Sequence, residues 1–195
     1  MRTTALGGVE HRSVAARRSP IRGQASGLLI ALVAGLAVEP SVGHAQGRSL
    51  SEATVADIQA AFETGSLTAE RMVERSMARL DAYDQQGPAL NTVLWLNDNA
   101  LARARELDAE RARSGPRSPL HGIPVVLKDN VDTADMPTTA GSVLLAGSLP
   151  PDDAFLVRRL RDAGAIVLAK VNMSEFASGP TMSSIGGWSR NPHDV

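Results

Sequence analysis

The second half of the chain alternates between short apolar runs of strand length and a run with helical periodicity. Residues 123–128 and 165–170 are the apolar runs, and residues 153–163 between them predict a helix. A strand, a helix and a second, continuously apolar strand are typical of a βαβ unit in a sheet that is covered on both faces. The pattern therefore predicts an α/β fold. A length of 195 residues allows one domain at most.

The part of the mature chain before this unit is predicted to be mostly helical. A Ser-x-x-Glu pattern at Ser49 and Glu52 predicts the start of a first helix, and Gly65 its end. The further expected elements are a helix over residues 68–80, a strand over residues 91–96 and a helix over residues 97–113. After the second strand of the βαβ unit, Asn172 and Glu175 repeat the capping pattern and predict a short helix.

Residues 1–45 have the composition of a secretory signal. Residues 1–27 carry five arginines and one acidic residue, and the apolar run 27–38 follows. That run is too short to cross about 30 Å of hydrocarbon, which takes about 20 residues. A buried or anchoring N-terminal helix is the alternative interpretation. We expect a removable signal, so that the protein meets the membrane only through this transient segment.

The expected cleavage position follows from two small residues. Gly43 and Ala45 stand where an export peptidase reads the chain before a cut at Gln46. The pair Arg17-Arg18 also suggests twin-arginine export, but the residues after it match that pattern poorly, so general secretion stays open. We expect a mature chain of residues 46–195 that is periplasmic or secreted.

Composition excludes several classes of function. The chain has no cysteine, which excludes disulfides, a thiol nucleophile and Cys-ligated metal sites. A net charge of −1 and a single tyrosine do not provide the basic, aromatic-rich surface of a nucleic-acid-binding protein. His121 is interpreted as a loop histidine, and no histidine or carboxylate cluster has ligand spacing, so we expect neither a metal nor another cofactor.

Lys128 is the first candidate for chemistry. It ends the first strand of the βαβ unit, at the edge where open α/β sheets keep their sites. A lysine there can be at least partly buried, and burial favours the neutral amine that acts as a general base. Strand alternation places Val126 on the same face and Asp129 on the other. On spacing alone, a lysine whose amine reaches solvent is the commoner arrangement, and Lys170 ends the second strand in the same way.

Five short blocks follow one another in a fixed order. They are Gly122-Ile-Pro with Lys128-Asp-Asn130, Thr139-Ala-Gly-Ser142, Asp153 to Ala165, Lys170 to Phe176, and Asn191-Pro192. In this order they resemble the N-terminal half of the amidase signature family, from about Leu50 to Val195. The block from Asp153 to Ala165, together with Gly187-Trp-Ser189, is most similar to exported peptide amidases and their bacterial relatives.

The resemblance implies a fold and a mechanism. The implied fold is an α/β domain with a large mixed, twisted sheet covered by helices on both faces, of which this chain supplies the N-terminal part. The implied enzyme is an amide hydrolase with a Ser-cis-Ser-Lys relay and an acyl-enzyme, in which the lysine matching Lys128 is the base. An incomplete sheet of this kind would expose a strand edge and apolar faces, so we expect residues 46–195 alone to aggregate or to fold only in part.

The serines of the relay are expected beyond the end of this chain. In the family, a Gly/Ser-rich block that carries the bridging serine follows the match to Asn191-Pro192, and the nucleophile comes later. Ser183 and Ser184 lie where family members line the substrate cleft, and they are the candidates for substrate binding. Loop hydrogen bonding is the commoner role for such serines, and also for Ser142 and Ser189.

Three functions remain open at this stage. The first is an exported amidase that acts on a small-molecule or peptide amide, with this chain as its N-terminal fragment. The second is the A subunit of a tRNA-dependent amidotransferase, which shares these blocks but works in the cytoplasm with partner subunits. The third is a non-catalytic exported remnant. The N-terminal segment favours the first over the second.

Overall fold

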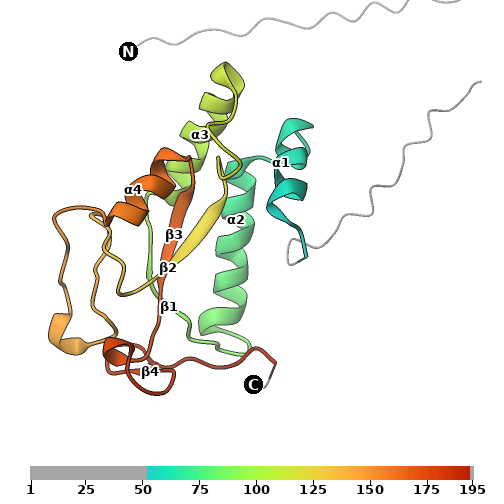
Figure 1. Cartoon of the computed structure of the whole chain (residues 1–195). Helices are drawn as coiled ribbons and strands as arrows, with labels where there is room; N and C mark the ends of the chain where they lie inside the picture. The colour runs from blue at the N-terminus through green and yellow to red at the C-terminus, as the bar shows by residue number, and fades with distance from the viewer. Residues whose placement is uncertain (1–51, 194–195) are drawn as a thin grey trace, which may run out of the picture. The chain divides into compact units, whose positions relative to one another are not determined.

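The computed structural model describes residues 52–193 (Figure 1). The predicted signal over residues 1–45, its cleavage position at Gln46, and Ser49 lie outside the described residues. Within residues 52–193, no helix is both long and apolar enough to span a membrane.

Within residues 52–193, four α-helices and two β-sheets define the fold. The helices are α1 (Val55–Glu63), α2 (Ala69–Leu80), α3 (Ala100–Ser114) and α4 (Phe155–Asp162). Shorter turns are a π-helical turn η1 (Asp81–Gln85) and the 3₁₀ turns η2 (Val143–Leu145) and η3 (Glu175–Ala177). The strands are β1 (Val93–Leu96), β2 (Pro124–Lys128), β3 (Ile166–Val171), β4 (Met182–Ser183) and β5 (Gly187–Trp188).

The main sheet is mixed and has the strand order β1-β3-β2. Strands β2 and β3 are parallel and are joined through α4, which is the predicted βαβ unit. Strand β1 pairs antiparallel with the other edge of β3. The burial of β3 explains its continuous apolar sequence, because Ile166 to Lys170 are all buried.

Helices cover both faces of this sheet. One core cluster joins α1, α2 and α3 to the sheet through Ile123, Ile166 and Leu168. A second cluster joins Val157 of α4 to Leu127 and Val167 on the strands. Figure 1 accordingly shows α4 on one side of the strands and α2 on the other. The expected α/β fold with helices on both faces is confirmed for this part of the domain.

The first helix begins later than the sequence pattern at Ser49 and Glu52 predicts. Helix α1 is capped at Thr54, whose hydroxyl accepts a hydrogen bond from the Asp57 amide at 3.2 Å. The Asp57 carboxylate accepts in return from the Thr54 amide at 3.0 Å. This second capping pair directly precedes the buried positions Ile58 and Phe62, so the packing of the helix selects it. The start predicted from Ser49 is therefore wrong.

A buried carboxylate closes the connection between α2 and β1. Asp84, in η1, accepts hydrogen bonds from the amide and hydroxyl of Thr92, both at 2.6 Å, and from the Val93 amide at 3.2 Å. Burial by itself would raise the pKa of Asp84, but these hydrogen bonds, with a further one from Gln85, outweigh it and lower the pKa below 3.8. The charged carboxylate thus fixes where β1 begins.

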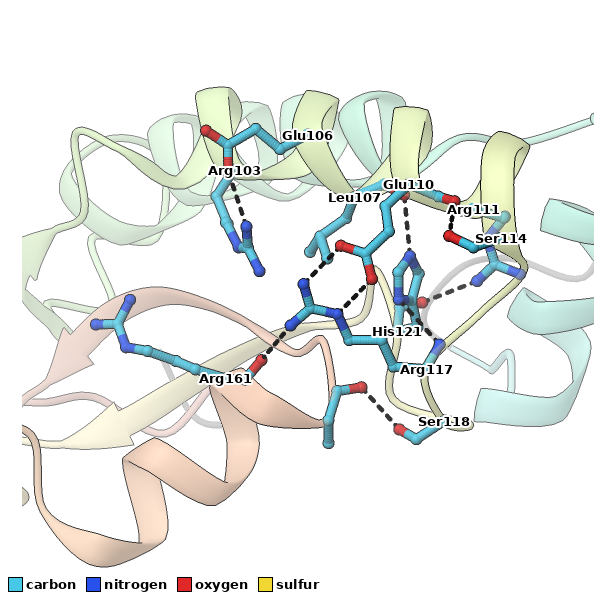
Figure 2. Close-up of polar contacts among 11 residues, drawn as sticks. Arg103, Glu106, Leu107, Glu110, Arg111, Ser114, Arg117, Ser118, His121 and Arg161 are labelled. Carbon is cyan, nitrogen blue, oxygen red and sulfur yellow. Dashed lines mark hydrogen bonds and ion pairs between the residues drawn. The ribbon is translucent and has the colours of Figure 1, made fainter.

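A polar network holds the segment between α3 and β2 (Figure 2). The Arg117 guanidinium pairs with Glu110 of α3, and the Arg117 amide donates to Nδ1 of His121 at 3.2 Å. Nε2 of His121 therefore carries the proton and donates to the Leu107 carbonyl at 2.9 Å. His121 is buried and uses both ring nitrogens within the fold, so its interpretation as a structural loop histidine is confirmed.

Several large apolar side chains remain exposed in the described structure. Leu144 is 82% exposed and Phe155 is 71% exposed. The others include Leu149, Leu156, Phe176 and Trp188. In a monomeric soluble domain, large contiguous patches of apolar surface are rarely exposed.

Candidate active site

Three segments meet at one end of the sheet: the loop after β2, the turn after β3 and the hairpin of β4 and β5. The loop after β2 contacts the turn after β3, because the Phe176 amide donates to the Ala140 carbonyl at 2.9 Å. The hairpin of β4 and β5 joins them, because the Val143 amide donates to the Ser184 hydroxyl at 3.1 Å. In Figure 1 these segments gather at the lower end of the strands, where β3 ends. The carboxyl ends of parallel strands are where α/β sheets place their sites.

Lys128 ends β2 at this edge, opposite Val171 of β3. Its side chain is exposed, and Val126 on the same face is 50% exposed. Of the two arrangements that the sequence leaves open for Lys128, the described structure has the one in which the side chain reaches solvent. The expected placement at the end of the strand is confirmed.

Lys170 is the buried lysine of the chain. Its side chain is 0% exposed, and its ammonium donates to the Pro137 carbonyl at 2.9 Å and to the Thr138 hydroxyl at 2.8 Å. Asp129, also fully buried, places Oδ1 at 3.6 Å from the Lys170 nitrogen. Burial lowers the pKa of Lys170 below 10.5, and the charge of Asp129 opposes that shift.

The loop after β2 wraps around the other oxygen of Asp129. Oδ2 accepts from the amide of Thr139 at 3.1 Å, from the Thr139 hydroxyl, and from the amide of Gly141 at 3.2 Å. The Asp129 carbonyl accepts from the Ala140 amide at 3.1 Å. Strand alternation correctly predicts that Asp129 turns away from the open face of Lys128.

The backbone around Asp129 adopts the left-handed region at residues other than glycine. Ala140 has φ of 51°, and Phe176 and Ala177, in the turn that it contacts, have φ of 48° and 59°. Gly141 is required at its position, because a Cβ there would lie 3.0 Å from the Cβ of Ser183 and 3.1 Å from the Met173 carbonyl. Such conformations cost about 1–3 kcal/mol each and cluster at functional sites.

The two serines that the sequence suggests for substrate binding differ in their exposure to solvent. Ser183 is 3% exposed, and its hydroxyl donates to Oδ1 of Asn172 at 2.7 Å and accepts from the Gly186 amide at 2.8 Å. Ser184 is exposed on the same hairpin. Ser183 thus holds the hairpin to the turn after β3, and a contact of either serine with substrate stays a prediction.

Glu175 joins these loops, a role that the sequence pattern does not reveal. Its carboxylate accepts from the Ser142 hydroxyl at 2.6 Å and from the Ser184 amide at 3.3 Å. The hydrogen bond from Ser142, followed by those from Ser184, lowers the pKa of Glu175. The predicted capping pair of Asn172 and Glu175 is wrong. The short turn follows Ser174 without a side-chain cap, the Asn172 side chain binds the β4–β5 hairpin, and the Glu175 side chain binds Ser142 and Ser184.

The described part of the chain shows no metal-binding arrangement. Among residues 52–193, no three histidine, cysteine, aspartate or glutamate side chains converge as a metal site. The groups at this end of the sheet include the exposed amine of Lys128, loop hydroxyls, backbone N–H groups and the Glu175 carboxylate.

Comparisons with known proteins identify the family. The model of the amidase family matches residues 71–195. The peptide amidase of Stenotrophomonas maltophilia superposes with a TM-score of 0.71 and 46% identity, over 74% of this chain and 31% of that one. An amidase family protein of Bacillus anthracis has a TM-score of 0.69 and 41% identity, over 73% of this chain and 29% of that one. The chain belongs to the amidase family.

A second kind of relative belongs to the same family. The A subunit of the glutamyl-tRNA(Gln) amidotransferase of Streptomyces avermitilis is 42% identical over 143 residues, which are 73% of this chain and 28% of that protein. The chain thus spans less than a third of the length of each of these relatives. The resemblance seen in the five sequence blocks is confirmed, and so is the α/β fold that it implies.

Proposed function

We propose that the protein is an amide hydrolase of the amidase family in which Lys128 is the base of a Ser-cis-Ser-Lys relay. The observation that carries the proposal is the position of Lys128. It lies within the family match, at the carboxyl end of a parallel strand and beside the loops that close this end of the sheet. The two serines would come from the remaining length of the family domain.

The relay moves one proton in each step. The neutral amine of Lys128 takes a proton from the bridging serine, which takes the proton of the nucleophilic serine as that oxygen attacks the amide carbonyl. Backbone N–H groups stabilise the oxyanion that forms. The proton then passes to the departing nitrogen, which leaves as ammonia or an amine. Water, activated by the same relay, hydrolyses the acyl-enzyme and restores the serine.

The similarity to peptide amidase supports an amide of a peptide or of a small molecule as the substrate. Ser184, exposed beside the Glu175 turn, is the better placed of the two candidate serines to contact it. Oligomeric assembly and cofactors are not needed for the proposed chemistry.

The similarity to the A subunit of an amidotransferase supports a second candidate function. Ammonia release separates the alternatives. We expect the purified full-length gene product to release ammonia from C-terminally amidated peptides or simple amides without any partner protein. Release from glutamine that requires partner subunits would favour the amidotransferase. No release under either condition would favour a non-catalytic protein.

We further propose that the mature protein is periplasmic or secreted and begins at or near Gln46. The proposal rests on the order of basic, apolar and small residues in residues 1–45. N-terminal sequencing of the protein recovered from the periplasm or medium is expected to start at or near Gln46. An intact Met1 or Arg2 on a protein retained in the cytosol would contradict it, and would leave the amidase proposal standing.

A further inference from the structure

Asp129 follows Lys128 directly, and its amide, its carbonyl and one carboxylate oxygen are hydrogen-bonded. Its amide donates to the Val171 carbonyl at 3.0 Å, which continues the pairing of β2 with β3 beyond the last paired residue, Lys128. Its carbonyl and carboxylate bind the amides of residues 139–141. The residue next to the proposed base is therefore the most firmly anchored point of the strand end.

Lys170 completes this anchor from the neighbouring strand. Its ammonium binds Pro137 and Thr138, so that the Asp129–Lys170 pair holds five consecutive loop residues, 137–141. Both side chains are fully buried, and Oδ1 of Asp129 makes no hydrogen bond within residues 52–193, facing only the charge of Lys170 at 3.6 Å. A buried ion pair that leaves an oxygen without a hydrogen bond contributes little to stability by itself. A role in fixing geometry accounts for it better.

The anchored loop also reaches the other side chains of the site. Ala140 binds the turn at Phe176, and Gly141 packs against Met173 and Ser183. Ser142 continues the contact through Glu175. The contacts of Asp129 therefore hold the backbone at which the exposed side chain of Lys128 begins.

We propose that Asp129, charge-paired with the buried Lys170, is a positioning residue that fixes Lys128 relative to the loops of residues 137–142 and 172–178. The proposal rests on the proposed function, because it positions the base of that reaction. Asp129 touches no reacting atom; it acts through the backbone of its neighbour. A displacement of a catalytic group by about 1 Å costs about 100-fold in rate.

The test uses the full-length gene product and separates kcat from KM. Asp129→Asn keeps the size of the side chain and removes the charge that faces Lys170. We expect its kcat to fall about 100-fold while KM changes less than about threefold, measured as ammonia release well below the unfolding temperature. Val157→Ala is the control, because it removes packing from the fully buried Val157 in α4 and leaves the loop unchanged. It should unfold at a lower temperature with a kcat within about threefold of wild type.

A second variant decides the matter if Asp129→Asn fails to fold. Thr139→Val removes only the hydroxyl that donates to Oδ2 of Asp129 and keeps the amide contact. It should lower kcat about three- to tenfold, again with little change in KM. The positioning role would be overturned if the wild-type protein is active and the folded Asp129 and Thr139 variants, destabilised no more than Val157→Ala, keep the wild-type kcat. An inactive wild type would instead overturn the proposed function, and the positioning role with it.

Discussion

Lys128→Arg in the full-length gene product is expected to abolish amide hydrolysis while the protein stays folded. Arginine keeps the charge and much of the length, but it does not deprotonate in proteins and so cannot serve as a base. Loss of a general base costs about 100- to 10,000-fold, and loss of one member of a relay that acts as a unit can cost more. Lys128→Ala should lose activity to a similar extent. The measurements are ammonia release and circular dichroism.

The exposure of Lys128 makes this substitution a clean one. Lys128 contributes little packing within the described residues, so we expect a small change in the unfolding temperature. Lys170→Ala, the control that the symmetry of the two strand ends would suggest, is unsuitable because Lys170 is fully buried. Arg113→Ala, at an exposed position in α3, is the better match for loss of a basic side chain. Near-wild-type hydrolysis by Lys128→Arg would refute the assignment of the base.

The fold was predictable from the sequence where local pattern and tertiary packing agree. The βαβ unit is such a case, because a strand buried on both faces must be continuously apolar. Helix α2 is another, since its N-cap Thr68 immediately precedes an amphipathic run. The hairpin of β4 and β5 was not predictable. Its short strands are held by distant side chains, such as that of Asn91, which donates to the carbonyls of Gly186 and Trp188.

The site was predictable in its position and not in its burial. Sequence places both Lys128 and Lys170 at strand ends, and it cannot tell which is covered. What separates them is the loop of residues 137–141, which folds back over Lys170 and Asp129. That contact depends on the register of β2 with β3. Leu127 pairs with Lys170 because the register shifts between Val125 and Val126. Residue spacing along one strand carries no information on such a register.

The two lysines should also differ in their effect on stability. Lys170→Met in the full-length gene product is expected to lower the free energy of unfolding by about 3–5 kcal/mol, because it leaves the Asp129 carboxylate buried without its counter-charge. Lys128→Met removes the same charge from a position that is exposed in the described structure, and it should change the free energy much less than Lys170→Met does. Denaturant unfolding of the two variants beside wild type measures the difference, and equal losses would contradict it.

The pH dependence of this difference has a defined sign. Burial lowers the pKa of Lys170 below 10.5, against the opposing charge of Asp129, so the folded protein releases this proton before the unfolded chain does. The unfolded chain binds more protons between the lowered pKa and 10.5, and the contribution of Lys170 to the free energy of unfolding therefore rises with pH across that window. That contribution is complete above 10.5 and is lost as the pH falls through the lowered pKa. Lys170→Met lacks the titrating group, so its free energy of unfolding should fall further behind that of wild type as the pH is raised through the window. A difference between the two proteins that stays constant with pH would show that the folded state does not perturb Lys170.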